Sequence, residues 1–512
     1  MKRFLIILMN ACLCAYMLVG GTLPVQASPL HNPVVFSIYL PLVVKSIAAP
    51  SATTAAATDI SGTTATLNGT VNANNGSTTV TFQYGLTTSY GSSATATQSP
   101  VSGTANAPVS AAISGLTPNT PYHFRVVAVN TGGTGNGSDA TFTTSPIIAT
   151  SISAGEYVTC ALTNTGGVKC WGNNSDGELG DGTTSERHTP VDVKGLTSVV
   201  VTGVSNGYKH TCVLTSLGGV KCWGYNLDGE LGNGKITNSL TPVDVSGLTS
   251  NVAGISANGF HTCAVTNAGA VWCWGYNAYG ELGNGTTTSS STPVKVKNGT
   301  GTDYLSGVSV VKAGGYHTCA LLSTGGMKCW GKNDTGQLGD GTFINRLTAV
   351  NSGLTSGVGA LSSGDAHTCA IISSSHGLKC WGYNAYGQLG DGSTTNHNTP
   401  ETISALSSGV DSLNAGARHT CVLMQTGSSK CFGYNAYGEL GNGTTTSSSS
   451  PVNVMNGGVP LSGVSLVRAG YFHSCALLTS GGVRCWGDNG FGELGNNSTN
   501  NSSTLVSVVG FP

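Results

Sequence analysis

Charged side chains are scarce in this chain. Lysine, arginine, aspartate and glutamate make up 8% of its 512 residues, and the formal net charge is -1. Ordinary globular domains carry roughly 25% charged residues. A nucleic-acid-binding surface needs clustered lysine and arginine, and charge-driven disorder needs an excess of one sign. The composition therefore excludes both classes, and we expect no nucleic acid among the partners.

Long apolar runs are absent after the first 20 residues. Near the N-terminus, residues 2–3 are basic, residues 4–19 are apolar apart from Asn10, and a small-residue site ends at Ala27. This pattern predicts a secretory signal peptide over residues 1–27, with an uncleaved membrane anchor as the alternative. No other stretch approaches about 18 apolar residues, so we expect no membrane span after signal removal and a secreted or cell-surface location. Residues 28–49 are interpreted as a linker.

Familiar catalytic and metal-binding motifs are also missing. The sequence has no Gly-x-Ser-x-Gly, phosphate loop or His-Glu-x-x-His. Its Asp-Gly and Asn-Gly pairs fit neither the EF-hand spacing nor the nonapeptide calcium repeat. We therefore predict no catalytic residue, no metal site and no cofactor, and we interpret the protein as a non-enzyme.

Residues 50–145 contain neither cysteine nor tryptophan. Alternation of apolar and polar residues between Gly, Asn and Pro turns predicts an antiparallel β-sandwich, with strands at 65–71, 80–84 and 123–129. The run from Leu116 to Tyr122, Leu-Thr-Pro-Asn-Thr-Pro-Tyr, resembles the tyrosine corner of fibronectin type III domains. The tryptophan of an early strand in that family is missing, and Leu67 is expected to fill its core position. The resemblance implies a spacer or adhesive module.

The sequence repeats from residue 147 to the end. Fourteen cysteines fall in seven pairs, and the first cysteine of a pair recurs after 50 to 56 residues. Each unit has a strand that leads into His-Thr-Cys, a Gly-Gly turn, a second strand with Lys-Cys-Trp-Gly, and a Gly-(Glu/Gln)-Leu-Gly-(Asp/Asn)-Gly turn. Four short strands in a unit of this length are typical of a propeller blade. The predicted fold class is all-β, with an N-terminal β-sandwich followed by a seven-bladed β-propeller over residues 147–512.

The two cysteines of each pair flank a short hairpin, where they can lie opposite each other at disulfide distance. An even number of cysteines in an exported chain favours the same interpretation. Metal binding by the histidine and both cysteines is the alternative, but a structural zinc site needs four ligands. We predict seven disulfides, each worth roughly 2–3 kcal/mol. The predicted pairs are Cys160 with Cys170, Cys212 with Cys222, Cys263 with Cys273, Cys319 with Cys329, Cys369 with Cys380, Cys421 with Cys431, and Cys475 with Cys485.

Three other recurring positions are interpreted as structural. The histidine before the first cysteine is expected to hydrogen-bond within its own blade. A catalytic general base would need one histidine with a distinct partner, whereas six repeats carry this histidine at the same position. The aromatic residue after the second cysteine is expected to pack between blades, with a ring of ligand-stacking indoles as the alternative. The turn acid is interpreted as a hydrogen-bonding group, because two repeats replace it with glutamine. These sets are His210, His261, His317, His367, His419 and His473; Trp171, Trp223, Trp274, Trp330, Trp381, Phe432 and Trp486; and Glu178, Glu230, Glu281, Gln337, Gln388, Glu439 and Glu493.

The Leu-Gly-Asp-Gly turn after Trp-Gly-x-Asn resembles the regulator of chromosome condensation repeat, in its secreted bacterial type, across residues 147–512. The resemblance implies a seven-bladed propeller. Functions in that family include nucleotide exchange on the small GTPase Ran, chromatin docking and, in a secreted bacterial relative, β-lactamase inhibition. The predicted signal peptide, the lack of a basic tail and the lack of a long insertion argue against nucleotide exchange here.

A ligand site should lie where the repeats differ from one another. The residue before each histidine varies, and so does the residue five positions after each Trp or Phe. Exposed Tyr, Phe and Arg are typical of binding hot spots, and half-buried loop packing is the alternative. The candidate partner-binding residues are Phe260, Tyr316, Arg418 and Phe472 at the first position, and Tyr279, Tyr386, Tyr437 and Phe491 at the second.

The sequence thus predicts a secreted or surface-displayed monomer that binds a protein or glycan partner through its propeller. The alternatives are a guanine-nucleotide exchange-like activity, by family analogy, and an extracellular propeller inhibitor or hydrolase. Scarce charge predicts weak electrostatic steering, so shape and aromatic contact should hold the partner.

Overall fold

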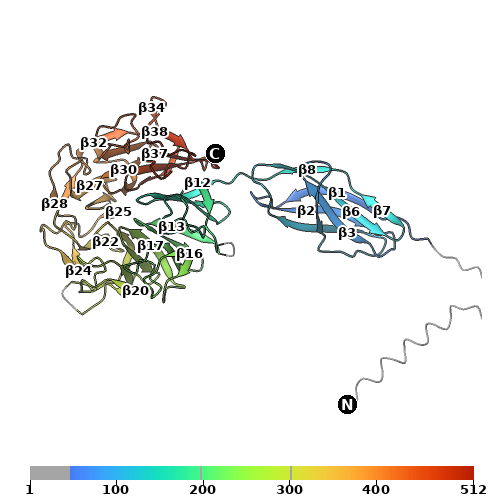
Figure 1. The fold of residues 1–512 in the computed structure, drawn as a ribbon, viewed down its shortest axis with the longest axis horizontal. Coiled ribbons are helices and arrows are strands. Elements are labelled where there is room, and N and C mark those ends of the chain that lie inside the picture. The colour runs from blue at the N-terminus through green and yellow to red at the C-terminus, as the bar shows by residue number, and fades with distance from the viewer. Residues whose placement is uncertain (1–45, 197–198, 300–301) are drawn as a thin grey trace, which may run out of the picture. The chain divides into compact units, whose positions relative to one another are not determined.

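The computed structural model describes residues 46–196, 199–299 and 302–512. The predicted signal peptide and residues 28–45 of the predicted linker lie outside this part. The described residues form two compact units, a small one built mostly from residues before 143 and a large one that reaches Pro512 (Figure 1). Among the described residues, no helix has the length and apolar character that crossing a membrane requires.

The small unit is the predicted β-sandwich. One sheet has the strand order β1-β2-β5, and the other has the order β4-β3-β6-β7, with β8 also paired to β6. Leu67, Phe82 and Phe124 are completely buried between them, and the ring of Tyr122 stacks on Phe142 at 5.6 Å. The strands are β1 (Ser51–Thr58), β2 (Thr64–Asn72), β3 (Thr79–Gly85), β4 (Ser92–Thr95), β5 (Asn106–Ser114), β6 (Pro121–Asn130), β7 (Gly133–Asn136) and β8 (Ala140–Thr143).

The large unit contains seven four-stranded antiparallel sheets in the part of the chain that the structure describes. We number these sheets one to seven along the chain, and each is formed by four consecutive strands. The first strands are β9 (Ala149–Ala154), β13 (Val201–Asn206), β17 (Val252–Asn258), β21 (Val308–Ala313), β25 (Val358–Ser363), β29 (Val410–Ala415) and β35 (Val464–Ala469). The second strands are β10 (Val158–Thr163), β14 (His210–Thr215), β18 (His261–Thr266), β22 (His317–Leu322), β26 (His367–Ile372), β30 (His419–Met424) and β36 (His473–Leu478).

The third and fourth strands complete each sheet. The third strands are β11 (Val168–Gly172), β15 (Val220–Gly224), β19 (Val271–Gly275), β23 (Met327–Gly331), β27 (Gly377–Gly382), β31 (Ser429–Gly433) and β37 (Val483–Gly487). The fourth strands are β12 (Arg187–Asp192), β16 (Ser239–Asp244), β20 (Ser290–Lys295), β24 (Arg346–Asn351), β28 (His397–Thr402), β32 (Ser448–Asn453) and β38 (Ser502–Ser507). Short additions are the 3-10 helix η1 (Ser404–Leu406), β33 (Met455–Asn456) and β34 (Val459–Pro460).

The seven sheets close into a ring. Each first strand contacts the first strand of the next sheet, and β35 of the seventh sheet contacts β9 of the first. The first strands therefore surround the centre of the propeller, and fourth strands such as β20, β24 and β28 lie at its periphery (Figure 1). Because every sheet face packs on a neighbour, the ring leaves only short edges open to pairing.

The glycine-rich turn lets each sheet approach its neighbour. In the third unit, Asn277 holds the turn, because its Oδ1 accepts the Leu282 N–H at 2.9 Å. In the fourth unit, Gly339 has φ of 68°, and a Cβ there would lie 2.6 Å from Nε1 of Trp381 in the next sheet. A side chain at this turn would therefore clash with the indole, and its backbone conformation favours glycine.

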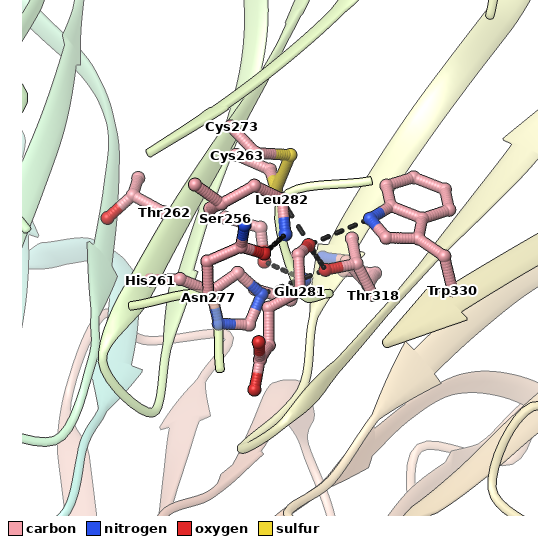
Figure 2. The surroundings of a disulfide bond; sticks show 12 residues. Ser256, His261, Thr262, Cys263, Cys273, Asn277, Glu281, Leu282, Thr318 and Trp330 are labelled. Atoms are coloured by element: carbon pink, nitrogen blue, oxygen red, sulfur yellow. Dashed lines mark hydrogen bonds between the residues drawn. A yellow bond between two sulfur atoms is a disulfide. The ribbon is translucent and has the colours of Figure 1, made fainter. Parts of the chain in front are cut away.

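The aromatic side chains pack between sheets, as predicted. Trp330, from the fourth sheet, lies in one buried cluster with Cys263, Cys273 and Leu282 from the third. Its indole Nε1 donates a hydrogen bond to the backbone oxygen of Glu281 at 2.8 Å (Figure 2). The same bond recurs at Trp171, Trp223, Trp274, Trp381 and Trp486. Phe432 is equally buried but has no N–H to donate.

Candidate functional site

All seven predicted disulfides are present. The two cysteines of each pair face each other across the hairpin, and their Cα atoms lie 4.1 Å apart in every sheet. The bridges are completely buried, with no accessible surface on any of the fourteen residues. Such a set is typical of proteins that fold in an oxidising compartment. In chain order, Cys160 is bonded to Cys170, Cys212 to Cys222, Cys263 to Cys273, Cys319 to Cys329, Cys369 to Cys380, Cys421 to Cys431, and Cys475 to Cys485.

The buried histidines link adjacent sheets and do not bond within their own blade, which corrects the sequence prediction. His261 lies at the start of β18, and its Nε2 is 2.8 Å from the Thr318 hydroxyl of the next sheet. Thr318 in turn donates to the backbone oxygen of Glu281 at 3.0 Å (Figure 2). Since the threonine proton is used there, His261 must donate from Nε2. The arrangement ties two sheets together with side chains that lie about one repeat apart in sequence.

The hydrogen bond from the histidine to the next sheet recurs at most sheet junctions of the ring. Equivalent bonds join His210, His317, His367 and His419 to the following sheet, and His473 reaches Thr159 of the first sheet at 2.8 Å. Burial lowers the pKa of His261 to about 3, so the imidazole is neutral at pH 7. Its Nδ1 has no hydrogen-bond partner among the described residues. A neutral, buried ring of this kind is a structural link.

The turn acids form hydrogen bonds within their turns, as predicted. Oε2 of Glu281 accepts the backbone N–H of Tyr279 at 2.9 Å, and Gln337 makes the same bond to Thr335 at 3.0 Å. The second carboxylate oxygen of Glu281 has no partner in the described part of the chain. Burial raises the pKa of Glu281 to about 7, because the charged form loses hydration there.

The two variable positions meet on one face of the propeller, which the sequence left open. In most sheets the residue at the first position contacts the residue five positions after the Trp or Phe of the preceding sheet, whereas Phe260 contacts Tyr208, Tyr225 and Tyr276. The rings of Tyr279 and Tyr316 lie 5.9 Å apart, and those of Tyr437 and Phe472 lie 5.6 Å apart. Phe491 and Tyr157 make the equivalent contact at 5.2 Å across the junction of the seventh and first sheets. We call the surface on which these pairs lie the aromatic face.

Aromatic rings form a continuous network across the aromatic face. The Arg418 guanidinium lies over the rings of Tyr386, Tyr434 and Phe472 at 5.5 to 6.0 Å. Tyr437 is 39% exposed, and the other seven candidate residues are half-buried. The connected rings are Tyr208, Tyr225, Phe260, Tyr276, Tyr279, Tyr316, Tyr383, Tyr386, Tyr434, Tyr437, Tyr471 and Phe472.

Sequence reasoning missed two further variable positions of the aromatic face. One is the x of Trp-Gly-x-Asn, where four repeats carry tyrosine: Tyr225, Tyr276, Tyr383 and Tyr434. The other lies two residues before the histidine, where Tyr208 and Asp365 come from the second and fifth sheets. The Tyr208 hydroxyl donates a hydrogen bond to the Asp365 carboxylate across the centre of the ring. Variation between repeats, the signal used for the other two positions, would have found both.

Two acidic groups of this face, Asp365 and Glu156, are half-buried. Burial raises the pKa of Asp365, although the Tyr208 hydrogen bond acts against this effect. Burial also raises the pKa of Glu156, beside Tyr157, to about 7. In the part of the chain that the structure describes, no three His, Cys, Asp or Glu side chains lie close enough to hold a metal ion. The face therefore offers aromatic surface together with the cations Arg418, Lys332, which lies over the rings of Tyr279 and Tyr316, and Lys209, which pairs with Asp176.

The fold and its inter-sheet links define a disulfide-bridged β-propeller built from repeats, with a β-sandwich before it. The family model described as "Regulator of chromosome condensation (RCC1) repeat" matches residues 165–214, 218–265, 268–321, 380–423 and 431–477. A second model of that description matches six segments from 149–178 to 464–493. A fibronectin type III model matches residues 48–144. The chain belongs to the RCC1 repeat family and carries an N-terminal fibronectin type III domain.

Individual relatives agree with this assignment. The Ultraviolet-B receptor UVR8 of Arabidopsis thaliana is 32% identical over 348 residues, which cover 67% of this chain and 78% of that protein. The human E3 ubiquitin-protein ligase HERC2 is 31% identical over 51% of this chain, a match that spans only 5% of HERC2. Yeast RCC1 (Prp20) bound to Kap60 has a TM-score of 0.57 at 22% identity, over 71% of this chain and 85% of that one. Human WBSCR16 has a TM-score of 0.58 at 22% identity, over 67% and 94%.

Proposed function

We propose that this chain is an exported binding protein whose aromatic face holds a protein partner. Residues 1–27 act as its signal peptide, and the fibronectin-type domain of residues 50–145 acts as a stalk for the propeller of residues 147–512. The seven buried disulfides support export, because such bridges are typical of proteins from oxidising compartments.

The observation that carries the proposal is the asymmetry of the aromatic face. The framework positions hold nearly the same residue in every sheet, whereas Tyr316, Ala366 and Arg418 occupy one equivalent position in three successive sheets. Packing of the ring does not require an aromatic residue there, since Ala366 serves in the fifth sheet. Tyr, Phe and Arg are enriched in the energetic centres of protein interfaces.

The geometry of the rings favours a protein over a glycan. A sugar stacks on an open ring face, but many rings here cover one another edge-to-face, as do Tyr386 and Tyr434 at 4.9 Å and 74°. A contoured surface of ring edges and hydroxyl groups suits the mixed side chains of a protein. Prp20p from Saccharomyces cerevisiae, whose structure is similar, binds Gsp1p and histones, so a propeller of this fold has protein partners elsewhere.

The test is capture of a partner by matched variants. The full chain and the triple variant Tyr279→Ala, Tyr386→Ala and Tyr437→Ala are immobilised and exposed to the extracellular fraction of the producing organism. We expect the wild-type chain to retain a protein that the triple variant binds at least tenfold more weakly, equivalent to about 1.4 kcal/mol or more. Calorimetry with the isolated partner measures the loss.

Tyr304→Ala is the matched control, because Tyr304 is 54% exposed and lies outside the aromatic face. This control should bind the partner like the wild type, and melting curves should show all chains folded. Equal retention by the triple variant would contradict the proposal. Retention that disappears after enzymatic deglycosylation of the partner would identify a glycan instead.

A further inference from the structure

Seven equivalent side chains meet at the centre of the propeller. Each lies on a first strand, opposite the first cysteine of its sheet, as Lys312 lies opposite Cys319. All seven line a central cavity of about 130 Å³. We call this set the channel ring, and its members are Ser153, Ser205, Ser256, Lys312, Ser362, Asn414 and Arg468.

Five members of the channel ring have a structural task. The Ser256 hydroxyl oxygen accepts the backbone N–H of Ala313, on the next first strand, at 3.0 Å. Ser153, Ser205, Ser362 and Asn414 accept the equivalent N–H at 2.8 to 3.0 Å. Ser205 donates its own proton to the backbone oxygen of Ala257 at 3.3 Å, whereas Ser153, Ser256 and Ser362 keep theirs available for donation. Lysine and arginine have no acceptor, so Lys312 and Arg468 cannot perform this task.

Lys312 and Arg468 bring two positive charges into the channel without a counter-charge. Neither forms an ion pair with any residue in the described ranges. The Arg468 guanidinium donates to the backbone oxygen of Val467, at 3.1 Å. Burial, and secondarily the charge of Arg468, lowers the pKa of Lys312 to about 8, and burial lowers the pKa of Arg468 to about 10. Both groups stay charged at pH 7, and both side chains are half-buried, so they retain some contact with solvent while facing the channel without an ion-pair partner.

The acidic group that lines the same cavity does not neutralise them. Glu156 lines the cavity together with Tyr208 and Tyr471. Burial raises its pKa to about 7, and the cation that opposes this effect is Lys209, on the aromatic face. Within the described part of the chain, neither Glu156 nor any other acidic group forms an ion pair with the two channel cations.

We propose that the channel ring binds a tetrahedral oxyanion, phosphate or sulfate. The Lys312 ammonium and the Arg468 guanidinium would balance its charge, and the hydroxyls of Ser153, Ser256 and Ser362 would donate to its oxygens. The cavity is large enough, because a site of about 150 Å³ holds benzene and an oxyanion of five heavy atoms is smaller. Such an anion would stabilise the propeller, because its contacts at the centre would link first strands from different sheets.

The test uses variants that restore the common residue of the ring. Lys312→Ser and Arg468→Ser, singly and together, place serine where four other sheets already carry it. The full chain is dialysed into chloride buffer, and its Tm is followed as phosphate or sulfate is added at constant ionic strength. We expect the wild-type Tm to rise with the logarithm of oxyanion concentration, and the double variant to show no such rise. Separate phosphate and sulfate titrations identify the preferred anion.

Lys235→Ser is the matched control, because it removes one positive charge from an exposed loop. It should respond to the anions like the wild type. The proposal would be overturned if added phosphate or sulfate does not raise the Tm of the wild-type chain and the dialysed chain releases no stoichiometric phosphate or sulfate on denaturation. An equal response in the double variant, or an equal response of the wild type to chloride, would also overturn it. If the double variant fails to fold, the Tm response of the single variants and the amount of anion released by the denatured wild type still test the proposal.

Discussion

Buried ionisable side chains make the stability of each sheet junction depend on pH. Burial raises the pKa of Glu281 from an ordinary 4.5 to about 7. The folded chain therefore binds this proton more tightly than the unfolded chain, so folding stability falls as pH rises from about 4.5 to 7. The histidines act in the opposite direction: with the pKa of His261 lowered to about 3, stability rises between about pH 3 and 6.5. A glutamate variant separates the two effects.

Glu281→Gln should remove one part of this pH dependence. Glutamine occupies the same turn position at residues 337 and 388, so the fold accommodates it. Relative to the wild type, the free energy of unfolding of the variant should increase by on the order of 1–3 kcal/mol between pH 5 and pH 8. The reason is that the folded wild type must ionise a buried carboxyl over that range. Denaturant unfolding at the two pH values measures the change.

Glu401→Gln provides the control, because it removes a carboxylate from the partly exposed strand β28. A pH-dependent gain in the free energy of unfolding that Glu281→Gln shows and Glu401→Gln does not is assigned to the buried turn position. If Glu281→Gln keeps a constant difference from the wild type, then Glu281 titrates alike in the folded and unfolded chains.

At the scale of the element, each central hairpin is closed by a disulfide at the sheet junction. The Cys263–Cys273 bridge lies in a buried cluster that also includes Trp330 of the next sheet (Figure 2). The bridge therefore constrains the unfolded hairpin and fills space between two sheets. Its removal should weaken both the hairpin and the junction.

Cys263→Ala with Cys273→Ala should lower the free energy of unfolding by about 2–3 kcal/mol, the cost expected for a closed loop of this length. Urea unfolding under non-reducing conditions measures the loss. Thiol titration of the denatured wild-type chain should find no more than two thiols, those of Cys12 and Cys14. Further free thiols would show that the propeller bridges do not all form in solution.

At the scale of the whole molecule, the ring depends on contact between its first and last sheets. Trp171 of the first sheet donates to the backbone oxygen of Glu493 at 2.7 Å, and Thr159 bonds to His473. The chain segments that meet here are more than 300 residues apart, so closure fixes the order of the whole propeller. An open ring would expose the faces of two sheets.

A chain that ends at Gly463 should lose cooperative folding, since it lacks the seventh sheet and leaves Trp171 without its neighbour. A chain that begins at residue 147 and keeps all seven sheets is the control and should melt cooperatively. Calorimetry and near-UV circular dichroism compare the two. Cooperative melting of the shortened chain at a similar temperature would favour an open, solenoid-like stack.

The sequence by itself determined the repeat, the four-strand unit, the cysteine pairing and the packing role of the tryptophans. These features depend on strand periodicity and on hairpins of about ten residues, in which Cys319 and Cys329 face each other by local geometry. Only the tertiary structure decided the contacts between sheets. His261 bonds to Thr318 of the next sheet, the variable loops share one face, and Lys312 lines a cavity with serines from other sheets. Such contacts join residues about one repeat or more apart, and their geometry comes from closure of the ring, which no spacing within a single repeat specifies.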